Sequence, residues 1–376
     1  MDEIMYLVYT HRLLGYRFRR PHPMRPERYL LTYELIKAYG LINTKIRVIK
    51  PKAFEENVLL LAHDGEYIDF VKSMSELGEG YLDYGDTPAF KGCFEAALLH
   101  VSATLTAVEE AIRSKTISVN MAGGYHHARR FSAGGFCIFN DVAIAAHYLI
   151  EEHKANRIAI VDFDVHHGDG TQELLYDRDV LKIDVHEDGR YLYPGTGFVS
   201  EVGEKDGYGY MVNIPMPPYS SDDDYILVFE EVVIPLLEWY KPEFLLCQCG
   251  VDAHYTDPLA HIQLTSRAYN YMGKRLSEIG KAYCNNRCVL LGGGGYNLSS
   301  TPRMWLVIMS SFLNLELSDE IPESWVKIFR KVTKSEGPRN LYDKFKAEEV
   351  PSVKRAVKEV IAEVKEVLNK VHGPII

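Results

Sequence analysis

The sequence has few cysteines, and their spacing excludes two common roles. Six cysteines occur among 376 residues, too few for the disulfide framework of a small secreted domain. The pairs Cys247/Cys249 and Cys284/Cys288 lack the two-residue gap of a zinc knuckle. Cys247 and Cys249 lie in the apolar run FLLCQCG, which favours buried thiols that behave as small hydrophobic groups. We therefore expect a reducing compartment.

Long apolar runs and long basic runs are also missing. No uninterrupted apolar stretch approaches the roughly 20 residues of a membrane span, and the segment MDEIMYLVYT lacks the basic start of a signal peptide. A formal net charge of −10 without a long basic run argues against direct binding to nucleic acid. These absences predict a cytoplasmic protein without a membrane partner. An acidic surface suits basic partners, or simply keeps molecules apart in solution.

Short apolar runs alternate with longer helical patterns, and no internal repeat or linker interrupts them. The expected strands span residues 4–9, 45–49, 116–120, 157–163, 180–186, 243–249 and 287–292. The expected helices span residues 28–39, 90–113, 139–153, 223–240 and 265–282. Near-continuous apolar strands between helices indicate an α/β fold with a parallel sheet covered on both faces. Ligands bind such sheets at the carboxyl ends of the strands.

The C-terminal part of the chain has a different character. Residues 316–350 are polar and charged, whereas valines recur at three- and four-residue spacing over residues 352–371. That spacing predicts an amphipathic helix. We expect a core at residues 1–315 and an extension at residues 316–376, whose helix packs on the core as part of the same domain.

Metal-ligand residues concentrate where one expected strand ends. The segment VDFDVHHGDG at 161–170 contains Asp164 and His166, an Asp-x-His pair that can direct a carboxylate and an imidazole at one divalent transition metal. His167 lies beside them, and Asp169 can alternatively cap a helix after Gly170. Two ligands are too few, because a catalytic zinc site usually has three protein ligands and an open position.

The third ligand is expected at the end of another strand. The apolar run 243–249 leads into Gly250, Val251 and Asp252, so Asp252 has the same position relative to its strand as Asp164. Taken alone, Asp252 is more typical of a turn. Asp257, just before a proline, is the competing candidate.

Two adjacent histidines follow the expected strand 116–120. His126 and His127 lie in AGGYHHARR, after small residues that allow a tight turn. Adjacent histidines lack metal-ligand spacing and suit proton transfer, for which each ring needs a carboxylate to fix its tautomer and raise its basicity. Asp162 and Asp169 are available for this task.

Four consecutive glycines, Gly292 to Gly295, precede Tyr296 after the last expected core strand. A phosphate cradle is one interpretation, but neither GxGxxG spacing nor Gly-Lys-Ser/Thr is present. The alternative is a loop that carries the Tyr296 hydroxyl into a site, where it donates a hydrogen bond to an oxyanion.

Together these segments resemble the class I histone deacetylase family, including its bacterial acetoin-utilization members. The resemblance covers roughly the first 310 residues. It implies a single-domain arginase/deacetylase fold, with a central, mainly parallel sheet of about eight strands, helices on both faces and the active site at the carboxyl ends of the strands. The shared motifs are HPMRPER (22–28), GGYHHA (123–128), GGFCIFND (134–141), DFDVHHGDG (162–170), YPGTG (193–197), QCGVDA (248–253) and GGGGYN (292–297).

The resemblance also implies roles for individual residues. The implied metal ligands are Asp164, His166 and Asp252, holding zinc, or ferrous iron, which the same ligand set accommodates. The implied catalytic residues are His126 backed by Asp162, His127 backed by Asp169, and the oxyanion donor Tyr296. The implied substrate-binding residues are Gly135, the tube walls Phe136 and Tyr193, the rim residue Asp86 and the pocket residue Leu259. The implied potassium site binds its ion through backbone carbonyls and is lined by Asp162, Asp164, His166, Asp184 and Val185.

Three features depart from the family pattern. Tyr193 replaces the usual Phe of the tube wall, and Asp184 stands where eukaryotic relatives tend to have Ser. The segment 177–181 is one residue shorter than in those relatives, so the resemblance implies no position for a second potassium ion.

The implied activity is removal of the acetyl group from acetyl-lysine in proteins. Metal-activated water attacks the amide, His127 is our choice of general base, and His126 gives electrostatic support. Three alternatives stay open. The substrate can be an acetylpolyamine or another small acylated amine. An arginase-like binuclear manganese hydrolase needs more bridging carboxylates than the single ligand set seen here. A non-catalytic acyl-lysine binder predicts loss of a catalytic residue, and none is missing.

Overall fold

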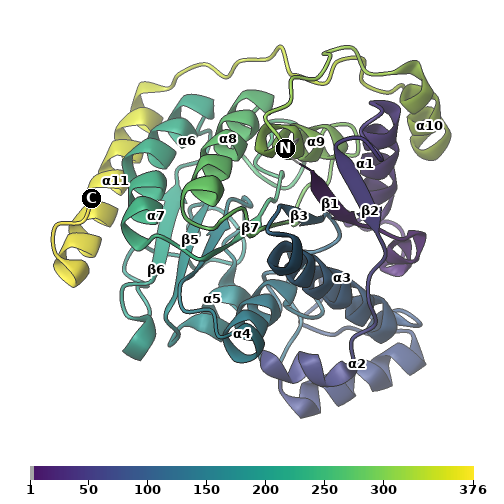
Figure 1. Ribbon diagram of the computed structural model, residues 1–376, viewed down its shortest axis with the longest axis horizontal. Helices are drawn as coiled ribbons and strands as arrows, with labels where there is room; N and C mark the ends of the chain where they lie inside the picture. Colours follow the sequence, from purple (N-terminus) through teal and green to yellow (C-terminus); the bar gives the residue numbers. More distant parts are fainter. Residues whose placement is uncertain (1–3) are drawn as a thin grey trace.

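A computed structural model describes residues 4–376 and is built around one parallel sheet (Figure 1). Residues 1–3, where the predicted core and the segment MDEIMYLVYT begin, lie outside the described residues. Eight strands of the described chain pair in the order β2-β1-β3-β8-β7-β4-β5-β6, which confirms the predicted fold class. The strands are β1 (Met5–Val8), β2 (Ile46–Ile49), β3 (Ser118–Asn120), β4 (Ile158–Asp162), β5 (Val180–Glu187), β6 (Met211–Met216), β7 (Phe244–Gln248) and β8 (Cys288–Leu291).

Seven of these strands lie where the apolar runs predict them, and β6 was not predicted. Its sequence, MVNIPM, contains Pro215, which pairs in register with His186 of β5. Proline cannot donate a ladder hydrogen bond and is therefore confined to edge strands or bulges. β6 is one of the two edge strands of the sheet in the described chain, so the residue that weakens the strand pattern is tolerated there.

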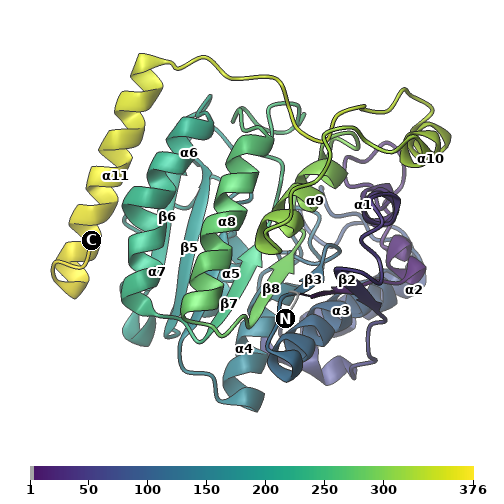
Figure 2. The same cartoon turned by 45° about the horizontal axis from the view of Figure 1, so that its top comes forward.

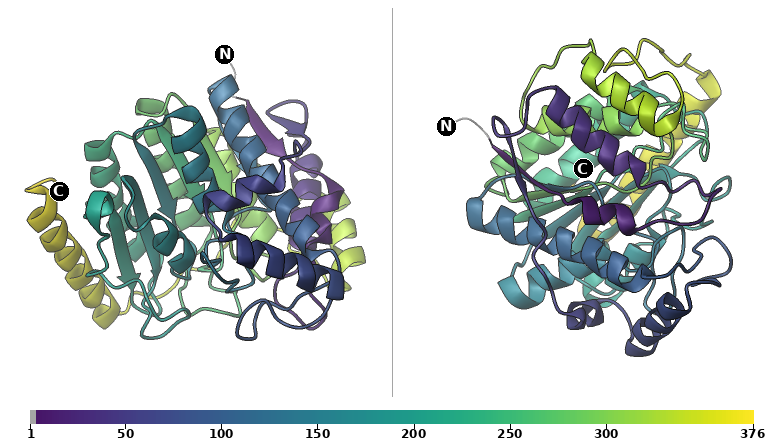
Figure 3. Two further views of the ribbon diagram at one scale, coloured as in Figure 1. Left: turned by 90° about the horizontal axis from the view of Figure 1, so that it is seen from below. Right: turned by 90° about the vertical axis from the view of Figure 1, so that its right-hand side faces the viewer.

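Helices cover both faces of the sheet, as Figures 1 and 2 show. Seen from below in Figure 3, the second layer lies in front of the strands. The first layer contains α1 (Glu27–Ala38), α6 (Asp222–Val228), α7 (Ile234–Tyr240), α8 (Ser266–Ala282) and α9 (Thr301–Phe312). The second contains α3 (Cys93–Ser114), α4 (Asp141–His153) and α5 (Asp169–Leu175), with α2 (Gly65–Leu77) packed outside α3.

The five predicted helices of the core are present, and the one expected at 223–240 contains a π-helical turn at Phe229–Val233 between α6 and α7. Three core helices, α2, α5 and α9, were not predicted. All twelve residues of α9 are buried, so its sequence has no polar face to reveal a helical period. The Trp305 indole of α9 donates to the Cys249 carbonyl at 3.0 Å, which ties the helix to the chain after β7.

The C-terminal helices pack against the sheet region from outside. The short helix α10 (Glu323–Thr333), also not predicted, contacts α1, and the predicted helix α11 (Pro351–His372) contacts β6 at the edge of the sheet (Figure 2). Helix α11 buries Val357, Ile361, Val364 and Leu368. A helix over an edge strand hides backbone groups that can otherwise pair with another chain. The division into residues 1–315 and 316–376 stays a prediction.

Two expectations from composition can be compared with the structure. All six cysteines are buried and free, which confirms the expectation for the thiols. Within residues 4–376, no helix combines the length and the apolar character that a membrane crossing requires.

If α11 belongs to the same cooperative unit as the core, shortening its buried side chains must destabilise the whole protein. Leu368 is 2% exposed, and we expect Leu368→Ala to lower the free energy of unfolding by about 2–5 kcal/mol. Urea denaturation followed by circular dichroism should show one transition with a lower midpoint. Lys358→Ala, at an exposed position of the same helix, is the control. A separate early transition, or an unchanged midpoint for Leu368→Ala, contradicts a single domain.

Candidate functional site

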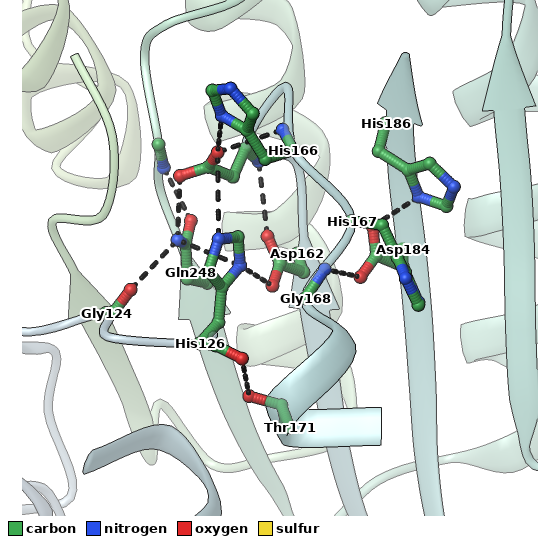
Figure 4. A network of polar contacts seen from close by, with 12 residues as sticks. Gly124, His126, Asp162, His166, His167, Gly168, Thr171, Asp184, His186 and Gln248 are labelled. Carbon is green, nitrogen blue, oxygen red and sulfur yellow. Dashed lines mark hydrogen bonds and ion pairs between the residues drawn. The ribbon is translucent and has the colours of Figure 1, made fainter. Parts of the chain in front are cut away.

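The candidate site lies at the carboxyl edge of four neighbouring strands. Strands β3, β8, β7 and β4 are adjacent in the sheet, and the loops that follow them carry most of the predicted site residues. Because all four strands are parallel, their carboxyl ends meet at one edge. Segments far apart in the sequence therefore converge there: the Gly293 N–H donates to the Gly123 carbonyl at 2.8 Å, and Figure 4 shows His126, Asp162 and Gln248 together.

Asp164, His166 and Asp252 form a compact set of potential metal ligands. One ligand atom from each lies within 4.8 Å of the other two, and all three residues are buried. His166 Nδ1 is 3.0 Å from Asp252 Oδ2 and 3.3 Å from Asp164 Oδ1. Burial and the nearby charge of Asp164 raise the pKa of Asp252. Two crowded carboxylates and one imidazole fit a zinc or ferrous ion, whose charge offsets their repulsion.

Two glycines let the backbone approach these carboxylates. A Cβ at Gly294 would lie 1.9 Å from Asp252 Oδ2, and a Cβ at Gly250 would lie 2.1 Å from Asp164 Oδ2. Gly294 also donates its N–H to Asp164 Oδ2 at 2.7 Å. The glycine-rich loop thus packs on the ligand carboxylates, which accounts for small residues there without a phosphate.

Gln248 supports the same carboxylate and was missed by sequence reasoning. Its Nε2 donates to Asp164 Oδ2 at 2.9 Å and to the Gly124 carbonyl at 3.1 Å. Its Oε1 accepts the Gly250 N–H at 2.7 Å. The only sequence signal was a polar residue at the end of an apolar strand. Partners of this kind fix the orientation of a metal ligand.

The two adjacent histidines are each held by a separate aspartate. His126 Nδ1 donates to Asp162 Oδ2 at 2.8 Å, and His127 Nδ1 donates to Asp169 Oδ1 at 2.7 Å. Their Nε2 atoms are 3.1 Å apart. The structure therefore brings together both His–Asp pairs in the combination that the resemblance implies.

The two rings differ in basicity. Burial opposes protonation of His126, but the charges of Asp162 and Asp164 raise its pKa to about 9. Burial and the positive charge of His126 lower the pKa of His127 to about 4, against the effect of Asp169. Arg129, which we did not predict, also donates to Asp169, at 2.6 Å.

Tyr296 is positioned by the residue that competed with Asp252 as a metal ligand. Asp257 Oδ2 accepts the Tyr296 backbone N–H at 2.8 Å, and Asp257 is not part of the ligand set. Burial, Asp252 and Asp164 raise the pKa of Tyr296 well above its ordinary value. Its hydroxyl therefore keeps its proton and can donate a hydrogen bond.

Four of these residues, His126, His127, Asp164 and Tyr296, line one small cavity. Phe136 packs edge-on against Tyr296, with ring centroids 5.7 Å apart, and Tyr193 lies 5.0 Å from the His127 ring. Gly135 has a φ of +51°, and a Cβ there would lie 2.2 Å from His127 Cδ2. The lining includes Met24, Arg28, His126, His127, Gly135, Phe136, Cys137, Asp164 and Tyr296.

Asp86 lies beside the mouth of this cavity, in the lining of two surface grooves. It accepts a hydrogen bond from the Thr87 hydroxyl at 3.0 Å, and Thr87 in turn accepts the Phe136 N–H at 3.0 Å. Burial and the neighbouring Asp83 raise the pKa of Asp86 to about 6. The predicted pocket residue Leu259 is partly buried, and the cavity and grooves formed by the described residues do not include it.

The remaining predicted residues lie below the metal set. His167 turns away to Thr196 Oγ1, 2.8 Å from its Nδ1, and to Gln172 Oε1, 3.1 Å from its Nε2. Asp184 and Val185 are buried in β5. The Asp184 carboxylate accepts hydrogen bonds from Lys182, His186 and the Gly168 N–H.

A parallel α/β fold with this site defines a hydrolase of the deacetylase class, and comparison with known proteins supports that assignment. A model of the histone deacetylase domain matches residues 22–312. The chain belongs to the histone deacetylase family.

Particular relatives refine the family assignment. The chain is 36% identical over 334 residues to the acetoin utilization protein AcuC of Bacillus subtilis (strain 168), covering 86% of each protein. It is 33% identical over 348 residues to AcuC of Staphylococcus aureus (strain MRSA252), covering 90% of this chain and 89% of the relative. The crystal structure of the HDA15 HD domain superposes with a TM-score of 0.81 at 26% identity, covering 98% of this chain and 95% of that one.

The contact of Gly294 with both carboxylates makes a direct prediction for metal binding. In Gly294→Ala the new Cβ must displace Asp252 or the loop, and we expect zinc affinity to fall at least about 10-fold. Competition with a chromogenic chelator measures this. Gly15→Ala is the control, since a Cβ there has no described heavy atom within 4 Å. Equal affinity in the two variants contradicts the placement of the loop.

Proposed function

We propose that the protein is a metal-dependent deacetylase that hydrolyses the side-chain amide of acetyl-lysine in proteins. One observation carries the proposal. Two aspartate-backed histidines and a protonated tyrosine face the same small cavity as Asp164, one of the three residues of the candidate metal-ligand set. Amide hydrolysis needs an activated water, a proton carrier and a donor for the oxyanion, and this cavity offers groups for all three tasks.

Asp164, His166 and Asp252 would hold the metal, zinc or ferrous iron. When bound there, such an ion polarises the acetyl carbonyl as a Lewis acid and lowers the pKa of water to around 7. The buried setting excludes most solvent, because the three ligands are at most 7% exposed. Gln248 and Gly294 hold Asp164 in place through their hydrogen bonds.

The histidine pair would move the proton. His127 accepts it from the attacking water and later returns it to the leaving lysine amine, while His126 supports the developing charge. Asp169 holds His127 at Nδ1 and leaves Nε2 toward His126 and the cavity. The Tyr296 hydroxyl donates a hydrogen bond to the oxyanion of the tetrahedral intermediate.

The cavity mouth would select the substrate. Phe136 and Tyr193 form the walls around an extended acetyl-lysine side chain, and Gly135 leaves room beside His127. Asp86 at the rim accepts hydrogen bonds from the substrate backbone, as the family resemblance implies. Its link through Thr87 to Phe136 couples the rim to the wall.

Removal of one hydroxyl tests the oxyanion assignment. We expect Tyr296→Phe to lower kcat about 100-fold or more, since one such donor contributes about 2.7–4 kcal/mol, while bound metal stays at the wild-type level. Tyr208→Phe is the control. Tyr208 is 54% exposed and lies just before β6, at the amino ends of the strands, whereas the site lies at their carboxyl ends. Near wild-type turnover of Tyr296→Phe contradicts the role of Tyr296.

Substrate class and metal number are tested together with enzyme reconstituted in defined zinc or ferrous iron. We expect one catalytic ion per chain, loss of activity with chelator, and the highest kcat/KM on acetyl-lysine peptides. Acetylpolyamines and longer acyl-lysines are the comparison substrates. A preference for acetylpolyamines by orders of magnitude reassigns the substrate. Two manganese ions per chain favour a binuclear hydrolase, and peptide binding without turnover favours a non-catalytic acyl-lysine binder.

A further inference from the structure

A lysine lies in the interior of the protein beneath the metal set. Lys182, in the middle of β5, is 1% exposed. Side chains alternate along a strand, so Lys182 and Asp184 point to the same face of the sheet. Burying a lone ammonium group is very unfavourable, and a charged lysine in such a place needs a close anion.

Asp184 is that anion, and three donors surround its carboxylate. Lys182 Nζ and the Gly168 N–H both donate to Oδ2, the latter at 3.0 Å, and His186 Nδ1 donates to Oδ1 at 2.6 Å. Burial opposes ionisation, but the charges of Lys182 and His186 hold the pKa of Asp184 well below its ordinary value. The pair is therefore a buried ion pair.

This ion pair supports the loop that carries the metal ligands. Asp184 pairs in register with Asp162 of β4, and Asp162 holds His126. Gly168, which donates to Asp184, stands between His166 and Asp169. Figure 4 shows Asp184 hydrogen-bonded to Gly168, with Asp162 nearby.

The predicted potassium site uses backbone carbonyls and is lined by Asp184, and the charges present at Asp184 do not fit that ion. At this position eukaryotic relatives tend to have serine, whose neutral hydroxyl leaves room for a separate cation. Here Asp184 already bonds the Lys182 ammonium at one oxygen and His186 at the other. A potassium ion at Asp184 would lie next to that ammonium in a medium of low dielectric, where repulsion between like charges is strong.

We propose that the Lys182 ammonium is the permanent cation of this site and takes the place of potassium. The positive charge that relatives are expected to recruit from solution is then covalently part of β5. The loop from Asp162 to Asp169 is held by Asp184 in every ionic medium, and potassium adds nothing to its stability there.

A comparison of melting temperatures tests this. The protein is freed of alkali ions, and Tm is measured in potassium chloride and in choline chloride at equal ionic strength. We expect no potassium-specific change at this site in the wild type. In Lys182→Met, which removes the charge and keeps most of the side-chain length, we expect potassium to raise Tm by at least about 3 °C more than in the wild type. Lys365→Met, which removes a partly exposed surface partner of Glu231, is the control.

Thallium(I), a potassium substitute with strong anomalous scattering, locates any bound ion in crystals. We expect no thallium beside Asp184 in the wild type and a peak there in Lys182→Met. A wild-type peak between Asp162 and Asp184 overturns the proposal, as does a Lys182→Met variant whose Tm responds to potassium no more than the wild type. The wild-type crystal decides the question even if the variant fails to fold. Neither readout uses an acetylated substrate, so failure of the proposed activity leaves this test unaffected.

Discussion

Burial of many carboxylates at one edge of a parallel sheet is the constraint on which the rest of the site depends. Each buried anion needs a compensating cation or several hydrogen-bond donors. Four of them have such partners within the chain. Asp162 pairs with His126, Asp169 with His127 and Arg129, and Asp184 with Lys182 and His186. Asp257 accepts two backbone N–H groups. The two candidate metal-ligand carboxylates, Asp164 and Asp252, also accept hydrogen bonds from the chain, and a divalent ion bound between them would offset their mutual repulsion. The buried aspartates are Asp162, Asp164, Asp169, Asp184, Asp252 and Asp257.

Strand order explains why these groups meet. The chain builds β3, then β4 to β6, and returns to fill the centre of the sheet with β7 and β8. The last two strands therefore insert their loops between the His126 loop and the Asp164 loop. The loop after β3 carries the histidine pair, the loop after β7 carries Asp252 and the loop after β8 carries Tyr296. The glycines after β7 and β8 let the backbone approach the Asp164 and Asp252 carboxylates closely.

Much of this arrangement could be predicted from the sequence, for identifiable reasons. Apolar strand runs that end in Asp or His place polar groups at one sheet edge, so position made Asp252 a candidate partner of Asp164, and the family resemblance favoured it over Asp257. The partners of those residues could not be predicted. Gln248 and Lys182 each read as one polar residue in an apolar strand, and only the neighbouring strands show what they contact. Strand β6 was hidden by its edge proline, and α9 by its complete burial.

The ion pair between Arg129 and Asp169 links one of the buried carboxylates to the solvent. Arg129 is 44% exposed, whereas Asp169 is 5% exposed and bonds to His127. Dissolved salt screens exposed charges strongly and buried ones weakly. The guanidinium is thus the point at which the composition of the solvent acts on the proposed catalytic histidines. An anion that binds Arg129 withdraws part of its charge from Asp169, and the proton affinity of His127 then follows the ionic medium outside the cavity.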